Sequence, residues 1–167
     1  GISPKINAPV LYNAGTIDIT GSVSGIDVLA ESELFHFTDY VQTGNPLDLK
    51  NVNNSIILGK GVAEKLLAEI GDVVQVTTSK GDRLPLKVVG YFQSGLADFD
   101  KVQSYASITT TQKLLGKPNN YLTDIQVKYS TPVGAPRTLT ESAAAARTAG
   151  ADAIIVTGAA TGAVTPA

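Results

Sequence analysis

Apolar and polar residues alternate along short stretches of the chain, and this pattern predicts a protein rich in β-strands. Near the N-terminus, Val10–Tyr12 and Thr16–Thr20 are predicted as short strands, because Ile17 and Ile19 alternate with polar neighbours. Gly21 and Gly25 are expected to break the apolar stretch that contains Val23 and Ile26 into pieces.

The clearest element is a β-hairpin in the middle of the chain. Val73–Thr78 and Leu84–Phe92 are rich in valine and aromatic residues, and Ser79–Asp82 supplies the turn. Pro85 has no amide hydrogen to donate, so its position is expected at a sheet edge. Further strands are predicted at Ile56–Leu58, Val102–Ile108 and Leu122–Tyr129.

Helical spacing of apolar residues predicts three helices before residue 130. The strongest pattern is Lys60–Ile70, which Gly71 is expected to end. Glu31–Val41 and Thr109–Leu115 are predicted as shorter helices. The apolar stripe of the strongest helix consists of Val62, Ala63, Leu66, Leu67 and Ile70.

Residues 131–167 differ from the rest because they are rich in alanine and lack aromatic residues. Thr138 and Glu141 match a capping box, which predicts a helix over Glu141–Ala149. Ala153–Val156 is a continuous apolar run, and we expect it to lie as a parallel strand beside Leu122–Tyr129. The fold class is therefore α+β, with a β-rich lobe around the central hairpin and a small βαβ lobe.

Composition excludes several classes of function. The chain has no cysteine and a single histidine, His36, so it offers no thiolate chemistry and no multi-histidine metal site. A net charge of −2 does not favour nucleic acid as a partner. No apolar run approaches the roughly 18 residues that span a bilayer, and the missing initial methionine suggests a piece of a longer product.

The candidate chemical sites are weak, and we predict no catalytic, cofactor-binding or metal-binding residue. His36 lies between two phenylalanines without a Gly-x-Ser-x-Gly nucleophile motif, so a partly buried structural histidine is expected. Gly158–Gly162 lacks the lysine of a phosphate-binding loop and is interpreted as a turn.

The acidic segment after the hairpin lacks the ligand spacing of a calcium loop, and a solvated loop is the simplest interpretation. Its best functional interpretation is contact with a partner, because exposed loops on rigid hairpins carry recognition. The residues of this candidate partner-contact loop are Ser94, Gly95, Leu96, Asp98, Phe99 and Asp100.

The order of motifs resembles the periplasmic core domain of MacB/LolC-type ABC transporter permeases. The resemblance covers residues 1–130. The motifs that carry it are Ser55–Leu66, Ile70–Val76, Leu86–Phe92, Gly95 with Asp100, Tyr105–Leu115 and Ile125–Lys128.

The resemblance implies a place and a role. It implies a domain in the periplasm, on the extracytoplasmic face of the bacterial inner membrane, that reaches the membrane only through segments outside this chain. It implies no cofactor, and its partners would be the rest of the permease, an ATPase subunit and a second permease copy or paralogue. Its role would be to couple ATP-driven motion to export or release of a lipidic or amphiphilic substrate such as lipoprotein.

Residues 131–167 depart from that pattern and leave alternatives open. Gly150–Gly162 looks more like a strand and loop of BtpA-family (β/α)8 barrels, so this closing segment is of foreign or engineered origin or a divergent native one. An enzyme interpretation, a phosphate-binding barrel fragment, rests on this segment alone. A free-standing protein-binding adaptor is the remaining alternative.

Overall fold

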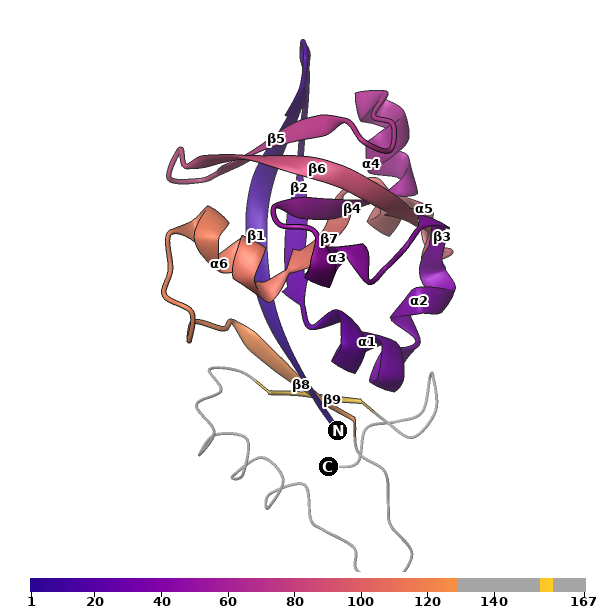
Figure 1. Cartoon of the computed structure of the whole chain (residues 1–167), viewed down its shortest axis with the longest axis vertical. Helices are drawn as coiled ribbons and strands as arrows, with labels where there is room; N and C mark the ends of the chain where they lie inside the picture. Colours follow the sequence, from indigo (N-terminus) through magenta and orange to yellow (C-terminus); the bar gives the residue numbers. More distant parts are fainter. Residues whose placement is uncertain (129–153, 158–167) are drawn as a thin grey trace, which may run out of the picture.

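The computed structural model describes residues 1–128 and 154–157, and it shows an α+β fold (Figure 1). The strands are β1 (Ile2–Ala14), β2 (Ile17–Ile26), β3 (Val41–Gly44), β4 (Ser55–Gly59), β5 (Val73–Thr78), β6 (Arg83–Phe92), β7 (Gln103–Ser107), β8 (Asp124–Lys128) and β9 (Ile154–Thr157). The helices are α1 (Val28–Phe35), α2 (Phe37–Tyr40), α3 (Asp48–Asn51), α4 (Lys60–Leu66), α5 (Ala97–Asp100) and α6 (Ile108–Leu115).

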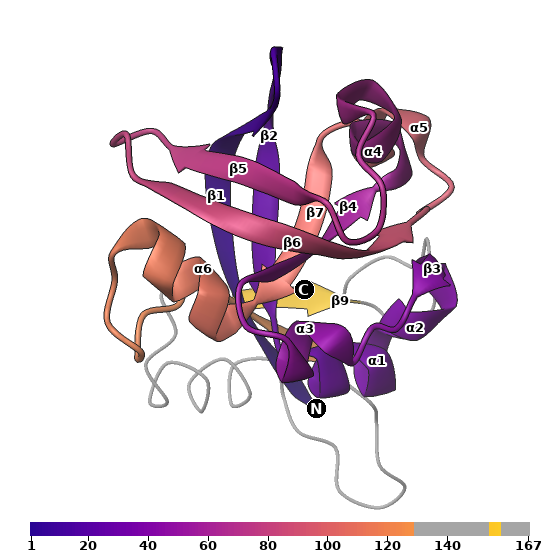
Figure 2. The same cartoon turned by 45° about the horizontal axis from the view of Figure 1, so that its top comes forward.

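Six of these strands pair in a closed ring, which we call the barrel. Their order is β1, β2, β7, β4, β6, β5 and back to β1. The pairs β2–β7 and β4–β6 are parallel, and the other four pairs are antiparallel. Figure 2 shows β5 and β6 crossing in front of the long strands β1 and β2. Ring closure gives each of these strands a neighbour on both sides over part of its length, which makes the ring the rigid body of the fold.

The core lies inside this ring. Ile6, Ala8, Val10 and Tyr12 of β1 are buried, as the two-residue period of a strand requires. Helix α4 adds Val62 and Leu66 to the same cluster, and α6 adds Leu114. A second buried cluster joins α2 and α3 to the barrel wall and contains Ile26, Val28, Phe37, Leu49, Ile57, Val89 and Phe92.

Strands β8 and β9 extend the sheet away from the ring. β8 pairs antiparallel with the first residues of β1, and β9 pairs parallel with β8, Ile125 opposite Ile154. The parallel strand predicted at Ala153–Val156 is thus confirmed for Ile154–Val156. The helix predicted at Glu141–Ala149 and the turn at Gly158–Gly162 lie outside the described residues.

The short, broken N-terminal strands were a wrong prediction, because β1 and β2 form one long hairpin of 13 and 10 residues. Gly21 does not interrupt β2. A Cβ atom there would lie 2.3 Å from the Val102 carbonyl oxygen and 2.5 Å from the Tyr12 ring. The glycine therefore permits close approach of the neighbouring chain inside a continuous strand.

Two predicted helices are shorter than the pattern suggested. The helix predicted at Glu31–Val41 divides into α1 and α2 at His36, which has a left-handed φ of 55°. α4 ends at Leu66, because Leu67 is also left-handed and the Ala68 amide then bonds the Ala63 carbonyl. Leu67 is 77% exposed and Ile70 is 44% exposed, so neither belongs to the core stripe.

The central hairpin and α6 with its C-cap Gly116 agree with the sequence pattern. Pro85 pairs only with Gln75 of β5, whereas β4 begins to pair with β6 two residues later at Lys87. Pro85 therefore lies at a local edge, as predicted. Among residues 1–128 and 154–157, no helix is long and apolar enough to cross a membrane.

Candidate functional site

The segment between β6 and β7, which contains the candidate partner-contact loop, folds around a buried carboxylate. Asp100 is 5% exposed, and its Oδ1 accepts hydrogen bonds from the Ser94 amide at 2.9 Å and the Ser94 hydroxyl at 2.6 Å. Asp98 is exposed on the same short helix α5. The simple expectation of a solvated acidic loop is therefore wrong for Asp100, which holds the loop together from inside.

Two glycines of the β4–α4 junction fix this loop to the barrel. A Cβ atom on Gly59 would lie 2.4 Å from the Asp100 carbonyl oxygen, and one on Gly61 would lie 2.8 Å from Lys101 Cγ. The backbone of α5 thus rests directly on the start of α4, and the two helices lie side by side in Figures 1 and 2. The Gly-x-Gly spacing was the sequence signal for this contact, although by itself it does not identify the partner segment.

Apolar side chains of the loop face solvent. Leu96 is 67% exposed, Phe99 is 38% exposed and Val102 is 39% exposed. Phe99 keeps an edge-to-face contact with buried Phe92 at 6.2 Å between ring centroids. The loop therefore presents apolar area from a fixed backbone, an arrangement typical of contact surfaces.

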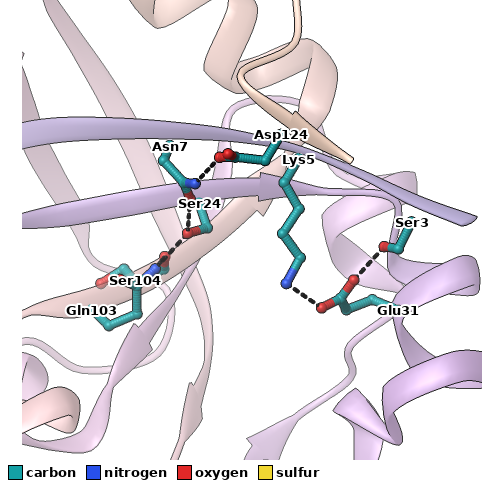
Figure 3. A network of polar contacts seen from close by, with 8 residues as sticks. All are labelled: Ser3, Lys5, Asn7, Ser24, Glu31, Gln103, Ser104 and Asp124. Atoms are coloured by element: carbon teal, nitrogen blue, oxygen red, sulfur yellow. Dashed lines mark hydrogen bonds and ion pairs between the residues drawn. The ribbon is translucent and has the colours of Figure 1, made fainter. Parts of the chain in front are cut away.

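A buried ion pair at the other end of the domain joins β1 to α1 (Figure 3). Lys5 Nζ lies 2.6 Å from Glu31 Oε1, and the Ser3 hydroxyl donates to the other oxygen of the same carboxylate. Ser3 and Lys5 alternate with the core residues of β1, so they occupy its opposite face, which α1 covers. The sequence signal was this polar alternation, but the partner Glu31 could not be inferred from it.

A separate chain of polar contacts crosses four strands (Figure 3). The Asn7 amide donates to the Asp124 carboxylate of β8, and its oxygen accepts from the Ser24 hydroxyl of β2 at 2.7 Å. Gln103 of β7 donates to the same Ser24 hydroxyl, also at 2.7 Å. The contacts tie β8 to the barrel, and sequence analysis did not foresee them.

The start of β1 and the end of β8 lie together. The Gly1 amino group donates to the Lys128 carbonyl at 3.2 Å, and the Lys128 amide donates to the Gly1 carbonyl at 3.0 Å. Lys128 Nζ also donates to the Leu34 carbonyl at the end of α1. We call this end the base; in Figures 1 and 2 the N-terminus marks it, and α4 and α5 lie far from it.

The other predicted candidates do not form a chemical centre. His36 is exposed at the junction of α1 and α2, where its left-handed backbone conformation turns the chain. The expected partial burial of this side chain was therefore wrong. Within residues 1–128 and 154–157, no group of three or more histidine, aspartate or glutamate side chains could hold a metal ion.

Comparison with known proteins gives the class of this domain. The model of the MacB-like periplasmic core domain matches residues 1–149, so the chain belongs to that family. It is an extracytoplasmic domain of a MacB/LolC-type ABC transporter permease.

A curated relative is the lipoprotein-releasing system transmembrane protein LolC of Neisseria meningitidis serogroup B, 26% identical over 143 residues. The match covers 77% of this chain and 34% of the relative, so the chain spans about a third of that protein.

Two solved structures are similar. The extracellular domain of the noncanonic ABC-type transporter YknZ from Gram-positive bacteria aligns with a TM-score of 0.53 and 18% identity, over 70% of this chain and 58% of that one. The periplasmic region of MacB from Actinobacillus actinomycetemcomitans gives 0.49 and 15%, over 71% and 52%. The YknZ likeness supports the α+β fold.

Proposed function

We propose that this domain is a non-catalytic transmission element, which passes ATP-driven motion of a permease to a lipidic or amphiphilic substrate such as a lipoprotein. The observation that carries the proposal is the arrangement of the base. The start of β1 and the end of β8 pair there, and the polar chain from Asn7 to Gln103 links them to the barrel. Motion applied at the base then moves the whole barrel.

The barrel is suited to transmit such motion because it is rigid. Its six strands close on themselves, and its interior is packed with fully buried side chains. The candidate loop is bound to this body through Asp100 and the two junction glycines. A displacement at the base would therefore reach Leu96 and Phe99 without being absorbed between them.

The partners follow from the family. We propose the rest of the permease, its ATPase subunit and a second permease copy or paralogue as partners. The contact would involve the loop Ser94, Gly95, Leu96, Asp98, Phe99 and Asp100. Lipoprotein as the substrate is supported by the relative LolC, which is a lipoprotein-releasing system transmembrane protein. Residues 131–167 would close the domain, and the family match through residue 149 supports a native origin for their first half.

The proposed absence of catalysis has its own test. The motivation is a chain without cysteine whose single histidine is exposed at a helix junction. Purified domain is expected to turn over no ester, phosphoester or nucleotide above blank. Turnover that disappears in His36→Ala would contradict the proposal.

The transmission role is tested in the intact permease reconstituted with its ATPase. Leu96→Asp places a charge on the exposed apolar loop and is expected to reduce substrate release several-fold while ATP hydrolysis continues. Leu47→Asp is the matched control, because Leu47 is also exposed (40%) but lies before α3, outside the loop. Equal release by wild type and Leu96→Asp would contradict the contact role of the loop.

A further inference from the structure

A small pocket with aromatic walls lies beside the candidate partner-contact loop. Its volume is about 190 Å³, and its lining residues are Phe37, Tyr40, Phe92, Ser94 and Tyr105. The Tyr105 ring meets Phe37 at 4.9 Å and Phe92 at 4.8 Å between centroids, both edge to face. Phe37 and Phe92 are buried, and Tyr40 is 45% exposed, so the pocket has fixed inner walls and one outer wall.

A buried carboxylate is bonded to one wall of this pocket. Ser94, one of the lining residues, holds the buried Asp100 carboxylate, and no cation pairs with Asp100 in the described part of the chain. Burial raises the pKa of the Tyr105 hydroxyl, and the negative charges of Glu31 and Asp100 raise it further.

No lysine or arginine is paired with Asp100 among the described residues. Lys5 is paired with Glu31, which balances that carboxylate. The stem of Lys101 lies against Gly61 at the start of α4. Asp100 is therefore the buried charge next to the pocket that lacks a counter-ion among the described residues.

We propose that this pocket receives the guanidinium group of an arginine side chain from a protein partner. The inference rests on the proposed partner contact of the neighbouring loop and specifies its chemistry. Aromatic faces attract cations, and the planar, weakly hydrated guanidinium stacks on rings better than an ammonium does. An aliphatic side chain would fill the same space but would leave the Asp100 carboxylate uncompensated, so charge complementarity selects the cation.

The test uses small probes of matched shape and the whole chain. N-acetyl-arginine amide, its neutral isostere N-acetyl-citrulline amide, and N-acetyl-leucine amide are titrated while aromatic NMR signals of the protein are followed. Saturable shifts of Phe37, Tyr40 and Tyr105 are expected with the arginine probe, and binding about 5- to 30-fold weaker with citrulline. Equal shifts with all three probes, or saturable shifts with none, would overturn the proposal.

Two variants locate the binding. Tyr40→Leu keeps an apolar outer wall but removes the aromatic face, and it is expected to weaken the arginine probe about 2- to 5-fold. Tyr121→Leu, before β8, is the matched control and is expected to bind as wild type; an equal loss in both variants would overturn the assignment. If the probes fail but Leu96→Asp still impairs release, the arginine occupant is rejected and the loop contact stands.

Discussion

Lys5 Nζ lies 2.6 Å from Glu31 Oε1, and the two side chains are only 13% and 5% exposed. The pair connects the first strand of the barrel to the first helix, at the end where β8 joins the sheet. A buried ion pair adds little net stability when it is intact, but it fixes how its two elements lie because either charge alone is costly. The base of the domain therefore has one strongly preferred arrangement.

Removing one partner is expected to be costly. Glu31→Ala leaves the Lys5 ammonium and the Ser3 hydroxyl without their acceptor, and we expect a loss of about 3–5 kcal/mol in the free energy of unfolding. Glu33→Ala on the same helix is the control, because Glu33 is exposed and should change stability by about 0.5 kcal/mol or less. Urea unfolding of both variants measures this; similar stabilities would mean that the pair is not structural.

Adjacent leucines at the end of α4 should behave in opposite ways. Leu66 is 3% exposed, so Leu66→Ala is expected to cost about 2–5 kcal/mol. Leu67 is 77% exposed with φ 52°, so Leu67→Gly is expected to preserve or raise stability by up to about 1 kcal/mol. Thermal unfolding compares them, and a large loss in Leu67→Gly would show that Leu67 packs in the fold.

Fully buried Tyr12 and partly buried Tyr105 predict a loss of stability in alkali. Burial is the main cause that raises the pKa of Tyr12 and of Tyr105 above the usual value of about 10. Above about pH 10 the folded state thus retains protons that the unfolded state has released. The free energy of unfolding is therefore not reduced by these tyrosines below about pH 10, and it falls as pH rises further. Urea unfolding between pH 8 and pH 11 should show the decline, and Tyr105→Phe should reduce its slope; an unchanged slope would contradict the assignment.

The pairing of β9 with β8 predicts slow exchange of backbone amides. Four residue pairs join the strands, from Ile125 with Ile154 to Lys128 with Thr157. Amides in Ile154–Thr157 that bond to β8 should exchange with deuterium much more slowly than those of the exposed turn Ser79–Asp82. Exchange as fast as in that turn would show that the pairing does not persist in solution.

Local pattern was sufficient where local chemistry decides the structure. The hairpin of β5 and β6 and the helix ended by Gly116 follow from alternation and from turn residues. The break at His36 and the early end of α4 at Leu67 could not be predicted, because a non-glycine residue with positive φ is uncommon and leaves no sign in the apolar pattern.

The candidate site was predictable only in part. The acidic loop could be located from the sequence, but the separate roles of buried Asp100 and exposed Asp98 depend on the approach of Gly59 from another strand. The ion pair of Lys5 and Glu31 and the aromatic pocket around Tyr105 bring together residues from distant parts of the chain. Contacts of that kind have no signature in the local pattern.

The central claim, that the domain moves as one body when ATP is used, can be measured directly by spin-label distances in the intact permease. The chain has no cysteine, so labels at Thr16→Cys and Leu96→Cys would be unique within the domain. The account predicts that the distance between these two labels stays constant through ATP binding and hydrolysis, whereas the distance from Leu96 to a label on the partner subunit changes. A change between Thr16 and Leu96, or a constant distance from Leu96 to the partner, would contradict it.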